Sequence, residues 1–253
     1  MKTKYLYLCM LFMPLFSCKK DNSASGASNV AAKGYVTGKV TDTKGNPIAG
    51  ASVLLDNTIT YASYVNGTSG PDGKYQIKLP TGNYSIWKAS ATIQKSYDNK
   101  TYTLDMAPDN TNSITDDGAV CDFSWKLSGQ QPDGSTYYGG TIDMDAGTGS
   151  AISDWNGIVL TLTPVSVLID GSPGRAMTIT FGSANWPNYV SGIIDIPIGR
   201  YKATAIYRYH NADYQLYLQN RQTNDGFRAE LVFDFEPQNR WGHRNAATLE
   251  FHE

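Results

Sequence analysis

Three tryptophans are the side chains of this sequence that could most directly hold a ligand. Trp155, Trp186 and Trp241 lie beside Asn, Asp, Pro or Gly residues and outside clear strand patterns. A flat ring on a loop can stack on the face of a sugar ring while neighbouring polar groups bond the hydroxyls. The alternative, and the commoner role of a single tryptophan, is to close the end of a hydrophobic core. The three residues are therefore candidate glycan-binding residues.

Patterns for metal binding are incomplete. Asp143 and Asp145 have the spacing that opens a calcium loop, but the later Glu and the entering helix of an EF-hand are missing. A polar turn is the expected structure there, and a bound cation is the alternative. The histidines, His210, His243 and His252, do not form a pair at the spacing of a zinc site. We expect no metal and no cofactor.

Patterns for catalysis are also missing. The sequence has no Gly-x-Ser-x-Gly, no His-Glu-x-x-His and no phosphate-binding glycine loop that opens a helix. Cys121 has no histidine near it in sequence, so a buried apolar role is expected rather than a nucleophile. A carboxylate pair for glycoside hydrolysis would depend on the fold. The sequence predicts a protein that is not an enzyme, with a hydrolase as the less favoured alternative.

Residues 1–17 have the features of a targeting segment. Lys2 and Lys4 precede an apolar run that is too short to span a bilayer. The run ends in Leu-Phe-Ser-Cys, which resembles the bacterial lipobox. That resemblance implies cleavage before Cys18 and attachment of acyl chains to it, which would anchor a soluble body firmly. The alternative is an ordinary secretory leader with a chance cysteine.

The segment that follows, residues 18–33, is short of large apolar side chains and predicts a flexible linker. In some bacteria an acidic cluster directly after the acylated cysteine favours export of a lipoprotein to the cell surface. Here Asp21 stands alone behind two lysines. An outer-membrane location is therefore predicted, with both the periplasmic face and the cell surface left open.

Residues 34–128 carry the pattern of a β-sandwich. Apolar and polar residues alternate in 36–41, in 74–79 and in 122–127, as in half-buried strands. Turn-forming residues such as Asp72-Gly73 separate these runs. Several short strands without a helical stripe indicate stacked sheets. Residues 128–136 are turn formers throughout and predict a linker to a second unit.

These residues also carry a family resemblance. The chain contains Gly-x-Val-x-Asp from Gly38, Gly-x-Pro-x-x-Gly-Ala-x-Val from Gly45, and Asp-Gly-x-Tyr-x-Ile-x-Leu-Pro-x-Gly-x-Tyr from Asp72. Together they resemble the carboxypeptidase regulatory-like domain, over residues 34 to 90. The resemblance implies a transthyretin-like (prealbumin-like) sandwich of the kind common in lipoproteins of Bacteroidetes. It implies a fold and no catalytic residue, and its glycines, its proline and Tyr84 are structural.

The second half, residues 137–253, resembles the first in the order of its motifs. Residues 196–201, Ile-Pro-Ile-Gly-Arg-Tyr, match residues 79–84, Leu-Pro-Thr-Gly-Asn-Tyr. Looser echoes of residues 38–42 and 49–55 occur at residues 140–143 and 156–162. Conserved order at this spacing predicts a diverged repeat. The fold-class prediction is all-β, with two tandem transthyretin-like antiparallel β-sandwiches after a lipoprotein signal peptide and a flexible linker.

The functional prediction follows from these elements. The net charge of −2 disfavours nucleic acid as a partner, because phosphate binding needs clustered Lys and Arg. We expect a non-catalytic outer-membrane lipoprotein that binds or scaffolds, with a glycan-binding role accessory to polysaccharide uptake. The alternative is a module that contacts other envelope proteins through sheet edges.

Overall fold

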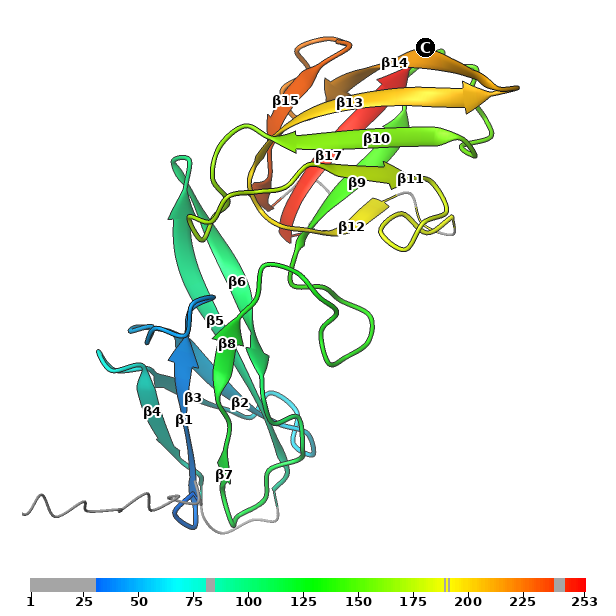
Figure 1. The fold of residues 1–253 in the computed structure, drawn as a ribbon. Coiled ribbons are helices and arrows are strands. Elements are labelled where there is room, and N and C mark those ends of the chain that lie inside the picture. Colours follow the sequence, from blue (N-terminus) through cyan, green and yellow to red (C-terminus); the bar gives the residue numbers. More distant parts are fainter. Residues whose placement is uncertain (1–30, 81–84, 189, 191, 239–243) are drawn as a thin grey trace, which may run out of the picture.

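The computed structural model describes residues 31–80, 85–188, 190, 192–238 and 244–253, and it has strands but no helix within these ranges. The strands form two sandwiches placed end to end (Figure 1). The prediction of an all-β chain with two tandem sandwiches is confirmed. Across the described ranges no helix is long and apolar enough to cross a membrane. The predicted signal peptide 1–17 and Cys18 lie outside the described residues.

The first sandwich contains eight strands in the order β3-β2-β5-β6-β8-β1-β4, with β7 beside β1. Strand β6 belongs to both layers, because its residues 100–105 pair with β5 and its residues 106–108 pair with β8. The predicted alternation holds in β4, where Tyr75 and Ile77 are buried between exposed neighbours. The bounds are β1 Tyr35–Thr41, β2 Ser52–Asn57, β3 Tyr64–Thr68, β4 Lys74–Lys78, β5 Trp87–Tyr97, β6 Lys100–Pro108, β7 Ala119–Val120 and β8 Phe123–Trp125.

The second sandwich contains nine strands in the order β11-β10-β13-β14-β17-β9-β12, with β15 beside β13 and β16 beside β17. Strand β14 joins the two layers as β6 does in the first sandwich: residues 212–216 pair with β13 and residues 217–220 with β17. The bounds are β9 Gly140–Ala146, β10 Ile158–Pro164, β11 Met177–Thr180, β12 Gly192–Ile196, β13 Arg200–Tyr209, β14 Ala212–Asn220, β15 Leu231–Asp234, β16 Glu236–Gln238 and β17 Arg244–His252.

Both sandwiches follow the same path. Strands β9 to β14 and β17 take the places of β1 to β6 and β8. The two matching hexapeptides stand in corresponding connections, after β4 and between β12 and β13, although residues 81–84 lie outside the described part. The pairings are antiparallel, as predicted, apart from β1 with β7 and β8 and β9 with β17, which are parallel. In each half the first strand and the last strand, β1 with β8 and β9 with β17, therefore run side by side in one direction.

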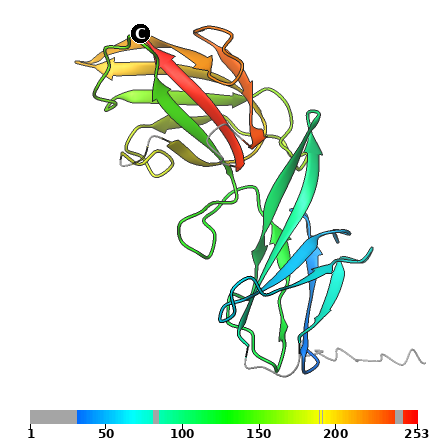
Figure 2. The same cartoon turned by 180° about the vertical axis from the view of Figure 1, so that it is seen from behind.

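A long hairpin joins the two sandwiches. Figures 1 and 2 show the tip of the β5–β6 hairpin reaching the second sandwich. There the fully buried Tyr102 hydroxyl donates a hydrogen bond to the Phe235 carbonyl at 2.7 Å. The Tyr97 hydroxyl donates to the Val167 carbonyl at 2.7 Å. Buried side chains of both halves consequently form one continuous hydrophobic cluster. We call this contact region the joint.

Ion pairs surround the joint. Arg200 pairs with Asp98 at 3.0 Å, Lys100 with Glu236 at 2.8 Å, and Arg244 with Asp105 at 3.1 Å; the six residues come from both sandwiches. Each pair is partly exposed, and such pairs contribute about 0–1 kcal/mol. A buried hydroxyl that loses its partner costs more, about 1–3 kcal/mol. The apolar contacts and the Tyr102 hydroxyl therefore dominate the joint.

The variant Tyr102→Phe tests this ranking. It removes the hydroxyl but keeps the ring. Among the residues that the structure describes, the Phe235 carbonyl then keeps the longer side-chain contact from Lys100 Nζ at 3.3 Å. We expect the free energy of unfolding to fall by about 1–2 kcal/mol, measured by chemical denaturation. The matched control is Tyr61→Phe, since Tyr61 is 98% exposed and should change nothing. An unchanged stability of Tyr102→Phe would show that the hydroxyl does not hold the joint.

Candidate functional site

The chain between the sandwiches, residues 128–139, forms a compact projecting loop that we call the linker loop (Figure 1). Asp133 holds its turn together: its carboxylate accepts hydrogen bonds from the backbone N–H groups of Ser135 and Thr136, both at 2.9 Å, and from the Thr136 hydroxyl at 2.7 Å. These bonds, first of all the hydroxyl's, lower the pKa of Asp133 to about 2. The loop therefore carries a fixed negative charge at neutral pH.

Asp195 fastens the base of the linker loop. It lies in the irregular part of β12 with a φ of 64°, and its carboxylate accepts the Gly129 N–H at 2.7 and 2.9 Å and the Gly139 N–H at 3.2 Å. A side chain at Gly139 would begin 2.6 Å from the Asp195 carbonyl carbon, so this close approach requires glycine. Burial raises the pKa of Asp195, and the two N–H donors oppose that rise.

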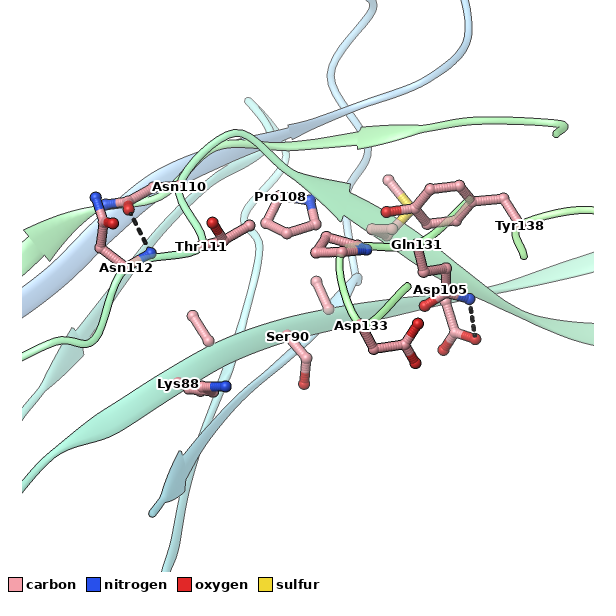
Figure 3. Close-up of a pocket in the computed structure, with 14 residues that line it drawn as sticks. Lys88, Ser90, Asp105, Pro108, Asn110, Thr111, Asn112, Gln131, Asp133 and Tyr138 are labelled. Carbon is pink, nitrogen blue, oxygen red and sulfur yellow. Dashed lines mark hydrogen bonds between the residues drawn. The ribbon is translucent and has the colours of Figure 1, made fainter. Parts of the chain in front are cut away.

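A cavity of about 380 Å³ lies between the linker loop and the first sandwich (Figure 3). We call it the linker groove. Strand β5, the end of β6 with the loop that follows it, and the linker loop each contribute one side. Its floor is apolar and includes Ala89, Ala91, Met106 and Pro108. Its polar lining consists of Lys88, Ser90, Asp105, Asn110, Thr111, Asn112, Gln131, Asp133 and Tyr138.

A second cavity, of about 810 Å³, lies on the other side of the linker loop. The two cavities share Asp105, Gln131, Asp133 and Tyr138, so they meet at the loop. Asp105 connects the parts physically, because it pairs with Arg244 of the second sandwich and accepts a hydrogen bond from Gln131 Nε2 at 3.4 Å. The site therefore depends on both sandwiches and on the loop between them.

The chemistry of the linker groove is that of hydrogen bonding. Amides, hydroxyls, an ammonium and carboxylates surround an apolar floor, which matches the edge hydroxyls and the C–H face of a sugar ring. A glycosidase would need a carboxylic acid that keeps its proton near neutral pH. Asp133 cannot supply it, because its pKa is held near 2. The amides and hydroxyls of the lining suit the groove to binding through hydrogen bonds.

The structure places two of the three predicted tryptophans at the core of the second sandwich. Trp186 is fully buried, so its ring cannot stack on a ligand. Trp155 is partly buried and packs edge-on against Trp186, Phe181 and Phe251, with ring centroids 6.1, 5.6 and 5.2 Å away. Both rings close the end of the second core, which is the alternative role stated above. Trp241 lies outside the described residues.

The candidate cation and nucleophile positions have structural partners. Asp145 pairs with Arg221 at 2.7 Å. No group of three or more potential metal ligands occurs among the residues that the structure describes. Cys121 is fully buried, and burial raises the pKa of its thiol to about 11, so the thiol stays neutral. Of the histidines, His243 lies outside the described part.

The residues of the linker groove were not found from the sequence. Residues 128–136 predict a linker because they are turn formers, and that prediction says nothing of a ligand. The available signal was the polar string of Asn110, Thr111 and Asn112 in the loop after β6. A polar loop of this kind is ordinary, and only the folded chain shows that it faces Gln131 and Asp133.

Comparisons with known proteins give one family match. The model of the carboxypeptidase regulatory-like domain matches residues 35–115. No curated protein matches the chain.

Several solved structures resemble the chain loosely. The Bacillus anthracis TIE protein is 13% identical, with a TM-score of 0.28 over 86% of this chain and 32% of that one, so the chain spans about a third of its length. The shaft pilin SpaA from Lactobacillus rhamnosus GG is 10% identical, with a TM-score of 0.23 over 86% and 97%. A putative cell adhesion protein from Bacteroides ovatus is 9% identical, with a TM-score of 0.24 over 88% and 97%. Likeness this loose carries no argument about function.

Replacing Asp195 tests how the linker loop is held. Asp195→Ala removes the acceptor of two N–H groups and places alanine at a positive φ, so we expect unfolding free energy to fall by about 2–4 kcal/mol. Amide hydrogen exchange at Gly129 and Gly139 should accelerate. The control is Asp195→Asn, which keeps an acceptor and tolerates this φ. Equal exchange in the alanine variant and the wild type would contradict the clamp.

Proposed function

Since residues 35–115 form a carboxypeptidase regulatory-like domain, we propose that the chain is a lipid-anchored, non-catalytic binding module of the outer membrane whose linker groove holds a glycan. The observation that carries the glycan part is the lining of the groove. Asn112 and Gln131 bring two amides to the apolar residues of the floor, and Lys88 and Ser90 add an ammonium and a hydroxyl on the face of β5 opposite to Ala89 and Ala91. The groove is a different site from the predicted tryptophans, of which Trp186 is buried in the core and Trp155 packs against it.

The groove suits a chain of sugars better than a single ring. Its cavity meets the larger one across the shared residues of the linker loop, so a polymer has room on both sides. The joint and Asp195 hold the walls in place before any ligand arrives, and a preformed site spends little free energy on ordering itself. These features support recognition of an extended polysaccharide.

A second candidate function, contact with another envelope protein, rests on the β2–β3 hairpin. Ile59, Tyr61 and Tyr64 are exposed there, and β3 is an edge strand of the first sandwich. Exposed aromatic side chains beside an unpaired strand edge favour a protein partner. This surface is separate from the linker groove, because none of these residues lines it.

The double variant Lys88→Ala/Asn112→Ala tests the glycan proposal. Both side chains line the groove, and neither forms a hydrogen bond with any residue that the structure describes, so the fold should keep its stability. We expect at least about tenfold weaker binding to soluble polysaccharides, measured by affinity electrophoresis against starch, xylan, galactomannan and pectin. The control Lys78→Ala/Asn66→Ala alters the same residue types on β4 and β3. Wild-type protein that binds none of the four would count against the proposal.

The anchor is tested by Cys18→Ala. Without the sulfur no diacylglycerol can be attached, so we expect the protein to move from the membrane fraction to the soluble fraction. Metabolic labelling with a fatty-acid analogue should mark the wild type alone. The control Cys9→Ala changes a cysteine inside the predicted leader and should leave the labelled mature protein unchanged. Membrane retention of an unlabelled Cys18→Ala protein would refute the lipid anchor.

A further inference from the structure

One six-residue turn occurs twice in the chain. Residues 97–102 read Tyr-Asp-Asn-Lys-Thr-Tyr and residues 209–214 read Tyr-His-Asn-Ala-Asp-Tyr. The first joins β5 to β6 and the second joins β13 to β14, which are corresponding hairpins of the two sandwiches. Both turns place their two central residues at positive φ, 46° and 62° in the first and 47° and 62° in the second. Tyr209 and Tyr214 are therefore the counterparts of Tyr97 and Tyr102.

The first of these hairpins, between β5 and β6, contacts the second sandwich through its two tyrosines. Its tyrosines lie against the second sandwich, and that sandwich brings an arginine to them. The backbone N–H of Arg200 donates to the Tyr97 hydroxyl at 3.1 Å, and the Arg200 guanidinium pairs with the Asp98 carboxylate at 3.0 Å. The surface that covers these tyrosines thus supplies a cation, and a carboxylate of the hairpin receives it.

The second hairpin carries the same tyrosines without a cover. Tyr209 is 50% exposed and Tyr214 is 52% exposed. Tyr207, which is directly opposite Tyr214 in the strand pairing, lies parallel to Tyr209 with an interplanar angle of 11° and a centroid distance of 5.8 Å. The three rings line a cavity of about 520 Å³ at the end of the second sandwich. We call them the tyrosine shelf.

The charges at the tyrosine shelf are negative. Asp154 and Glu253 line the same cavity. No Lys, Arg or His is among its described lining residues, and the His210 ring stacks on Tyr209 with a centroid distance of 3.9 Å, so Tyr214 offers the freer ring face. The Glu253 carboxylate accepts hydrogen bonds from Ala151 N–H and the Ser150 hydroxyl, which lower its pKa and keep it ionised. The neighbouring Arg208 does not neutralise them, because its guanidinium is paired with Asp213 through two contacts of 2.8 and 3.1 Å.

The wall that carries Asp154 is held in place by the core. Trp155 packs on Phe251, and the Gly157 carbonyl accepts the Arg208 N–H at 2.9 Å. A side chain at Gly157, where φ is 93°, would begin 2.2 Å from the Arg208 carbonyl oxygen, so the wall and β13 touch without space between them. The shelf is consequently a preformed site with aromatic faces and carboxylates.

We propose that the tyrosine shelf binds an arginine side chain presented by a partner protein. A guanidinium stacks on tyrosine faces and pairs with carboxylates at the same time, which no neutral ligand does. The lining contains no amide side chain, in contrast to the linker groove, so a neutral sugar would find few matched partners. The proposal is independent of glycan binding in the linker groove, because the two cavities share no residue.

The test uses the purified full chain and two small probes, N-acetyl-arginine methylamide and its citrulline analogue. The analogue has nearly the same shape but no charge. We expect the arginine probe to bind in the millimolar range, with NMR shift changes at Tyr209 and Tyr214, and the citrulline probe to bind at least about fivefold more weakly. Raising the salt concentration should weaken the first probe and not the second.

Two variants and one control locate the site. Tyr214→Ala and Asp154→Asn should each weaken the arginine probe by about fivefold or more, and Asn keeps an acceptor for the Asn156 N–H that Asp154 bonds at 3.0 Å. The control is Tyr217→Ala, which removes an exposed ring from the opposite face of the same strand. Far-ultraviolet circular dichroism verifies folding.

Three results would overturn the proposal. Equal binding of both probes would show an apolar site without charge selection. If Tyr217→Ala weakens binding of the arginine probe as much as Tyr214→Ala does, the probe binds outside the tyrosine shelf. The third result is that neither probe changes the NMR shifts of Tyr209 and Tyr214, whereas a neutral oligosaccharide such as cellotetraose does. The shelf would then be a sugar-binding site.

Discussion

The bond from the buried Tyr102 hydroxyl to the Phe235 carbonyl fixes how the two sandwiches meet, and the rest of the molecule depends on that meeting. Ion pairs such as Arg200–Asp98 surround it, but they are partly exposed and weak. The linker groove needs the joint, because Asp105 contacts Arg244 of the second sandwich and Gln131 of the linker loop together. A hinge at the joint would separate the walls that this carboxylate connects.

The duplicated topology explains why the chain has one docked hairpin and one uncovered hairpin. Each sandwich has a strand, β6 or β14, that passes from one layer to the other, and the hairpin before that crossing extends beyond the core. The second sandwich covers Tyr97 and Tyr102, the tyrosines of the hairpin in the first sandwich. Among the residues that the structure describes, no such cover lies over Tyr209 and Tyr214, which are 50% and 52% exposed. The tyrosines that dock in the first hairpin are thus exposed at the corresponding position of the second hairpin, where a partner could bind them.

The fold was predictable from the sequence because its signals are local. Alternation around Tyr75 and Ile77 sets a strand, and the hexapeptide at residues 196–201 marks the second unit. The candidate sites were not predictable from the sequence, because burial and side-chain contacts depend on residues that are far apart in the sequence. Trp186 is buried by Phe181 and Trp155, and the linker loop is clamped by a residue 66 positions from Gly129. A tryptophan among polar neighbours has the same local pattern whether it faces solvent or a core.

The end-to-end arrangement also orders the sites relative to an anchor. If the mature chain begins with acylated Cys18, the tether of residues 18–33 reaches at most about 58 Å when extended. The first sandwich follows it, then the linker groove, and the second sandwich lies beyond (Figure 1). The tyrosine shelf then stands farther along the molecule than the groove. A polysaccharide in the groove and a protein on the shelf would not compete, because the two cavities share no lining residue.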